Sequence, residues 1–176
     1  MLNNKTLIEF IKLRFKKNKL TILDEGAGLT IFLKEIKALL IKESINVETT
    51  AITLTPEVTK KNSNVDVLIK QDTLKFKPSK SYDLIFSVFG GVHYNLKDLD
   101  KNLVLKLSHS LSKNGVFFLG LNRLSDFRGK EKPVPDYFFT NIKKSFNKNG
   151  FDIEYESILA NVLYRLPIYV FKITRK

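Results

Sequence analysis

The residues best suited to chemistry stand together in one short stretch, Leu23-Asp24-Glu25-Gly26-Ala27-Gly28. An apolar run leads into this stretch, and a helix-like pattern begins just after Gly28. A strand, a glycine-rich turn and a helix in this order let the backbone approach a nucleotide-like ligand closely, because glycine carries no side chain. An acid at the strand end, here Asp24, can accept hydrogen bonds from a ribose or an amino group. Two glycines are common in turns, so this prediction depends on the surrounding elements.

Those elements alternate between apolar runs and amphipathic helix-like segments. We expect helices at residues 5–17, 30–43, 98–111 and 137–148, with a short one starting at Thr55-Pro56-Glu57, and strands at 20–23, 47–54, 65–69, 82–88, 116–121, 151–157 and 164–174. Gly115 and Gly150 should act as left-handed helix caps. No helix separates the last two expected strands. Because the elements alternate with no internal repeat and no linker, the pattern predicts one α/β domain over 1–176, with a helix at 1–17 and a core at 18–176. Its sheet should be Rossmann-like, doubly wound and seven-stranded, with an antiparallel last strand beside the fifth and helices on both faces.

Over residues 18–174 the order of motifs resembles the class I S-adenosylmethionine-dependent methyltransferases of the type 11/12-like group. The stretch around Asp24 resembles the acidic-x-Gly-x-Gly loop of that family. Further segments resemble its ribose, adenine, fourth-strand and fifth-strand motifs, namely Ala51-Ile52-Thr53-Leu54-Thr55-Pro56-Glu57, Gln71-Asp72-Thr73, Tyr82-Asp83-Leu84-Ile85-Phe86-Ser87 and Leu111-Ser112-Lys113-Asn114-Gly115. The resemblance implies S-adenosylmethionine as the cofactor.

The resemblance also implies a set of site residues. Asp24 would contact the methionine amino group and Asp72 the adenine amino group, while His93 and Tyr94 would lie on the substrate side as catalytic residues. The expected cofactor contacts are Asp24, Gly26, Ala27, Gly28, Thr53, Leu54, Asp72, Thr73 and Ser87.

Three positions depart from the family pattern. The ribose-binding acid is replaced by Thr53, the third loop glycine by Thr30, and an apolar residue by Glu25. The change at Thr53 matters most, because a charge-assisted carboxylate–diol contact is lost, which would weaken cofactor binding by about one to two orders of magnitude.

Methyl transfer from a sulfonium needs mainly in-line placement and exclusion of water. Cytosine-C5 methylation of the usual kind needs a cysteine, and the chain has none. The loop after the fourth strand, residues 87–91, lacks the proline-rich motif typical of adenine-N6 methylation, and Ile31 stands where a nicotinamide-binding loop has its third glycine. The remaining acceptors are an O or N atom of a small molecule, a lipid precursor, a carrier-bound group or a non-cytosine RNA position.

The composition sets further bounds. The net charge of +12 suits RNA or an acidic protein as a partner, although lysine spread over every surface by a biased genome would give the same charge. Without cysteine and with only two histidines, no metal site is expected. No apolar run reaches the roughly 18 residues of a membrane span and no signal peptide is visible, so we expect a cytoplasmic monomer or homodimer. An organelle transit peptide is the alternative for the basic amphipathic start.

Two hypotheses therefore stand side by side. The first is an active methyltransferase. The alternative is a degenerate methyltransferase-like binding or assembly module whose basic surface meets RNA or a protein partner, and Thr53 is the residue that separates the two.

Overall fold

A computed structural model describes residues 4–16, 19–88, 101–122, 124–125, 131–132, 143–155 and 168–176. In chain order the elements are α1 (Asn4–Arg14), β1 (Lys19–Glu25), α2 (Ile31–Lys42), β2 (Asn46–Thr53), α3 (Lys60–Ser63), β3 (Val67–Lys70), η1 (Thr73–Lys75), β4 (Tyr82–Val88), α5 (Lys101–His109), β5 (Leu111–Asn122), β6 (Leu124–Ser125), β7 (Glu131–Lys132), β8 (Phe151–Tyr155) and β9 (Ile168–Arg175). Residues 143–148 are also helical.

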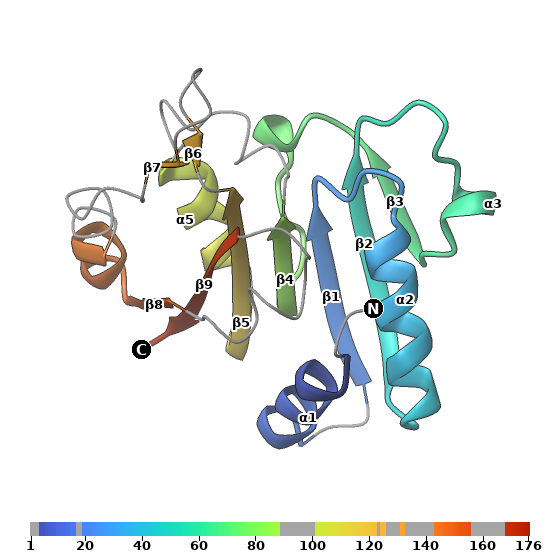
Figure 1. Ribbon diagram of the computed structural model, residues 1–176, viewed down its shortest axis with the longest axis horizontal. Helices are drawn as coiled ribbons and strands as arrows, with labels where there is room; N and C mark the ends of the chain where they lie inside the picture. The colour runs from blue at the N-terminus through green and yellow to red at the C-terminus, as the bar shows by residue number, and fades with distance from the viewer. Residues whose placement is uncertain are drawn as a thin grey trace.

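Seven strands form one sheet in the order β3-β2-β1-β4-β5-β9-β8 (Figure 1). The first five strands in the chain pair in parallel, and β9 pairs antiparallel with both β5 and β8. The predicted doubly wound, seven-stranded sheet with an antiparallel last strand beside the fifth is therefore confirmed. A separate small sheet contains only β6 and β7.

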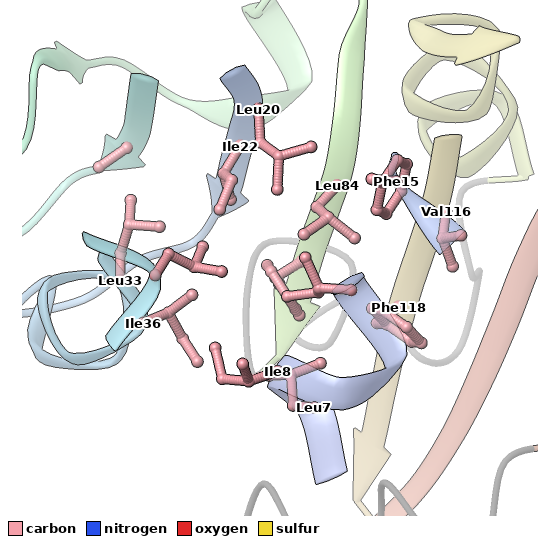
Figure 2. Packing of buried hydrophobic residues seen from close by; sticks show 14 of the residues in the cluster. Leu7, Ile8, Phe15, Leu20, Ile22, Leu33, Ile36, Leu84, Val116 and Phe118 are labelled. Atoms are coloured by element: carbon pink, nitrogen blue, oxygen red, sulfur yellow. The ribbon is translucent and has the colours of Figure 1, made fainter. Parts of the chain in front are cut away.

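Helices cover both faces of the sheet, and each face has its own apolar core. On one face α1 and α2 pack on β1, β4 and β5, where Leu33, Leu84 and Phe118 are fully buried (Figure 2). On the other face Leu107 of α5 and Phe146 of the helix at 143–148 join Ile85 and Phe117. Adjacent residues of β4 and β5 thus enter opposite cores, as expected for central parallel strands that are apolar on both sides.

The amino-terminal helix α1 packs on one face of the sheet. Leu7, Ile8, Ile11 and Phe15 are all buried against the sheet, while Arg14 on the other side of α1 is exposed. Within the described residues no helix is long and apolar enough to cross a membrane.

Two local predictions were wrong. The helix expected to start at Thr55-Pro56-Glu57 is instead a turn, closed by the Val58 amide donating to the Thr55 carbonyl at 3.3 Å, and α3 begins only at Lys60. Gly115 does not cap a helix, since α5 ends at His109 and the φ of Gly115 is not positive. It lies inside β5, beside an irregularity in the pairing with β4, where a Cβ would stand 2.9 Å from the Tyr82 carbonyl oxygen. Close backbone approach, rather than turn geometry, therefore explains this glycine.

The prediction that Gly150 caps a helix is confirmed. Gly150 follows the helical residues 143–148 with φ 79°, so it adopts the left-handed conformation that commonly ends a helix.

Candidate functional site

The strand order reverses direction at β1, which has β2 on one side and β4 on the other. In open α/β sheets the crevice at the carboxyl ends of such strands is the usual place for a ligand. The loop after β1, residues 26–30, lies at this edge and leads into α2. The site is therefore built on the ends of three neighbouring strands.

The loop between β1 and α2 has an unusual backbone. Gly26 and Gly28 have φ angles of 71° and 49°, and the Ala27 amide donates to the Ile52 carbonyl of β2 at 2.9 Å. A Cβ placed on Gly28 would meet no atom within 4 Å. The glycine at 28 is thus not explained by crowding inside the protein, and its backbone faces open space in which a ligand could approach it.

Thr30 adopts a backbone conformation that usually favours glycine. Its φ of 61° is left-handed although its side chain is β-branched, and it stands immediately before α2 without a side-chain capping bond. Such a conformation costs roughly 1–2 kcal/mol for a non-glycine residue. The loop therefore keeps a left-handed conformation at a position where the β-branched side chain of threonine disfavours it.

Thr53, at the end of β2, ties the loop to the sheet. Its hydroxyl donates to the Gly28 carbonyl at 3.0 Å and accepts from the Thr55 amide at 3.1 Å, and the residue is only 3% exposed. Since a hydroxyl has a single proton, Thr53 can offer a ribose only its remaining acceptor position. The contacts described for Thr53 fix the shape of the loop. The sequence did not predict this role.

Asp24 is a buried acid that lacks a hydrogen-bond donor among the described residues. It is 4% exposed, and no described residue donates a hydrogen bond to its carboxylate. Burial first, and then the neighbouring charge of Glu25, raise the pKa of Asp24 well above its ordinary value. Buried polar groups are nearly always hydrogen-bonded, so a carboxylate left in this state is suited to an incoming cation or donor.

Glu25, which sequence reasoning noted only as a departure from the family, is a second buried acid. It is fully buried, and the Ser87 hydroxyl of β4 donates to its Oε2 atom. The two residues are register partners on adjacent strands, so their side chains share a face. Ser87, predicted as a cofactor contact, thus has a partner inside the protein.

The predicted adenine-side residues follow β2 and β3. Asp72 caps η1, because its Oδ1 atom accepts from the Leu74 amide at 2.9 Å, and Thr73 beside it is buried. Leu54 comes directly after β2 and is 69% exposed. Two more leucines, Leu29 after β1 and Leu74 after β3, are 60% and 45% exposed. Three neighbouring loops of one sheet edge therefore each present an uncovered apolar side chain.

The predicted catalytic pair His93 and Tyr94 lies outside the described residues. Among the residues that the structure does describe, no group of three histidine, cysteine, aspartate or glutamate side chains could hold a metal ion.

Comparison with known proteins shows what this fold is similar to. A methyltransferase from Clostridium acetobutylicum that depends on S-adenosylmethionine matches with a TM-score of 0.68 at 16% identity, covering 97% of this chain and 89% of that one. The plantazolicin methyltransferase BpumL in complex with SAH matches with a TM-score of 0.67 at 17% identity, covering 98% and 82%. A TehB-like methyltransferase from Corynebacterium glutamicum matches with a TM-score of 0.60 at 18% identity, covering 96% and 86%.

The likeness extends to structure and not to sequence. No protein-family model matches the chain, and no curated protein matches it. The fold is that of the class I S-adenosylmethionine-dependent methyltransferases, as the order of motifs predicted.

Proposed function

We propose that the protein transfers a methyl group from S-adenosylmethionine to an O or N atom of a small-molecule, carrier-bound or RNA acceptor. One observation carries this proposal most: the open, left-handed glycine loop lies directly beside a buried carboxylate that has no donor among the described residues. We further propose that residues 1–176 act as a single domain.

The residues present fit this cofactor. Asp24 would hold the cationic amino group of its methionine portion, because a positive charge relieves a buried carboxylate. Gly26, Ala27 and Gly28 would receive that portion against bare backbone. The apolar side chain of Leu54 would pack on the adenine ring, and the oxygen of Asp72 that does not cap η1 would accept from the adenine amino group.

The cofactor, when bound, supplies a methyl group already activated on a sulfonium, so the protein itself needs little further chemistry. Its part is to hold the two reactants in line and to keep water out, which alone can contribute several kcal/mol. Thr53 holds the glycine loop to β2, and Glu25 holds Ser87 at the end of β4, so both pairs serve to fix the shape of the site. His93 and Tyr94 remain our candidates for removing a proton from the acceptor.

The test is calorimetric titration with S-adenosylmethionine and S-adenosylhomocysteine, comparing wild type with Gly28→Val and Gly150→Val. Both glycines have positive φ, and at both a Cβ meets nothing within 4 Å, so both substitutions impose similar backbone strain. Only Gly28→Val places a branched side chain in the site, so it alone should abolish binding, by about a hundredfold or more. Equal binding by the two variants would contradict the proposed location.

A second function, a degenerate module that no longer binds the cofactor, is favoured by a specific observation. The hydroxyls of Thr53 and Ser87, two positions that the family resemblance assigns to the cofactor, are both engaged inside the protein. If wild type binds neither ligand at millimolar concentration, this alternative replaces the first.

A further inference from the structure

Two hollows lie at the amino edge of the sheet, opposite the glycine loop. The first, of about 360 Å³, is lined by Lys80 and Lys106 together with His109 and three serines. The second, of about 370 Å³, is lined by Arg14, Lys16 and Lys113. We refer to them as the first and second hollows. Both therefore have walls rich in cationic side chains.

The two hollows lie at the starts of the same two strands, β4 and β5. Residues 78–81 and Asp83 come from the approach to β4, while residues 109–110 and 112–114 come from the approach to β5. These segments are bound together, since the Tyr82 amide donates to the Ser110 carbonyl at 2.8 Å and Tyr82 pairs with Leu111. The hollows thus flank one pair of strand starts, the first beside α5 and the second beside the end of α1, on opposite faces of the same sheet edge.

Within the described part of the chain, the positive charge of this edge is largely uncompensated. Arg14 and Lys106 donate to the backbone carbonyls of Asn114 and Leu74, which carry no net charge. Lys80 pairs with Glu48. The carboxylate in the lining, Asp83, already accepts from Ser112 on one oxygen and from Thr21 on the other. The remaining excess of cations calls for an anionic ligand.

The chemistry of the lining favours phosphate over an acidic protein surface. Exposed serines, Ser79 and Ser81, stand beside the lysines of the first hollow, and hydroxyl groups with lysine or arginine are the usual donors to phosphate oxygens. None of the exposed large apolar residues of the described chain lines either hollow. A protein partner would be expected to find such apolar anchors.

We propose that this edge, spanning the first and second hollows, binds the phosphodiester backbone of a nucleic acid. The exposed imidazole of His109 already packs edge-on against Phe151, with 5.1 Å between the ring centroids, so binding should depend mainly on charge and be tolerant of sequence. The site lies at the opposite edge of the sheet from the glycine loop, and it stands apart from the proposed methyl transfer.

The experiment measures binding of a short single-stranded RNA by fluorescence anisotropy over a range of salt concentrations. The test variant combines Lys106→Ala with Lys113→Ala, one residue from each hollow. The matched control combines Lys34→Ala with Lys61→Ala, which removes the same charge from exposed positions on α2 and α3. The test variant should lose about tenfold in affinity, and its slope of log affinity against log salt should become shallower by about 1.4, since each lost contact to a single strand contributes about 0.7.

The control should lose less than about threefold in RNA affinity. The Lys106→Arg, Lys113→Arg variant should bind RNA as wild type does, because the positive charge and the neighbouring serine hydroxyls are both kept. Equal losses in the two alanine variants would overturn the proposal in favour of diffuse surface charge, as would absence of RNA binding at low salt. Polyglutamate binding as tightly as RNA, with the same loss in the test variant, would show an acidic-protein surface instead. Cofactor titration of the same proteins reports on the glycine loop separately.

Discussion

Two buried aspartates at opposite edges of the sheet, Asp83 and Asp24, differ in the hydrogen-bond donors that surround them. At the amino edge, Asp83 accepts from the amide and the hydroxyl of Thr21, and its own amide donates back to that hydroxyl. Asp66 makes the same three bonds with Thr49. At the carboxyl edge, Asp24 is buried with no described donor.

The repeated threonine–aspartate clip joins neighbouring strands, β1 to β4 through Asp83, and β2 to the start of β3 through Asp66. An acid that is supplied with donors stabilises the fold, whereas an acid without them costs free energy unless something else binds it. In this protein, hydrogen-bond supply, rather than burial alone, distinguishes Asp83, which stabilises the fold, from Asp24, which we propose binds the cofactor.

The largest effect should follow from breaking the better-buried clip. Asp83→Ala removes the acceptor for Thr21 and Ser112 at a position only 2% exposed, so we expect a loss of about 3–5 kcal/mol in the free energy of unfolding. Asp66→Ala is the matched control. Its side chain is 40% exposed where it meets Lys37, so about 1 kcal/mol should be lost. Denaturant titration measures both, and equal losses would contradict the role given to burial.

A pH series should sharpen the contrast between the edges. Partial burial raises the pKa of Asp66, but hydrogen bonds from Lys37 and Thr49 outweigh it and leave that pKa below its ordinary value. The stability that Asp66 contributes is therefore complete above the unfolded-state pKa and is lost as the pH falls through the folded-state value.

The pKa of Asp24 is shifted in the opposite direction to that of Asp66. Its pKa is raised by burial and by Glu25, so the folded state keeps a proton that the unfolded state releases near pH 4. Its contribution is lost as the pH rises from there toward the folded-state pKa. Denaturant midpoints of wild type should fall more steeply over this range than those of Asp24→Asn. Parallel curves would contradict the assignment.

Much of the fold was open to prediction from the sequence, because the periodicity of apolar residues reports directly on which faces are buried. The seven strands of the doubly wound sheet and the antiparallel last strand beside the fifth were anticipated. The predictions at Pro56 and Gly115 failed because a proline-containing turn and a helix start share residue preferences, and because a glycine needed for close approach resembles a cap.

Prediction of the site went less far. The turn after β1 and the place of Asp24 near the end of that strand were predicted, because a strand, a glycine-rich turn and a helix follow one another in the sequence. The bonds from Thr53 to Gly28 and from Ser87 to Glu25 join residues 25 and 62 positions apart in the chain. Such contacts form only when β1, β2 and β4 are brought together in the fold, so no local sequence pattern predicts them.

The smallest effect concerns the strained loop residue. Thr30→Gly removes a β-branched side chain from φ 61° and should raise the free energy of unfolding by about 1 kcal/mol, reduced by the loss of buried contacts. Thr30→Ala keeps the left-handed penalty and should not stabilise. If alanine stabilises as much as glycine, strain at this position is not the cause.

The most direct test of the account is to measure stability and cofactor affinity together for wild type and Asp24→Asn near neutral pH. If Asp24 is a buried acid kept for a cationic ligand, the variant should unfold at higher denaturant concentration and yet bind S-adenosylmethionine at least about tenfold more weakly. A variant that is less stable than wild type and binds the cofactor equally well would contradict it.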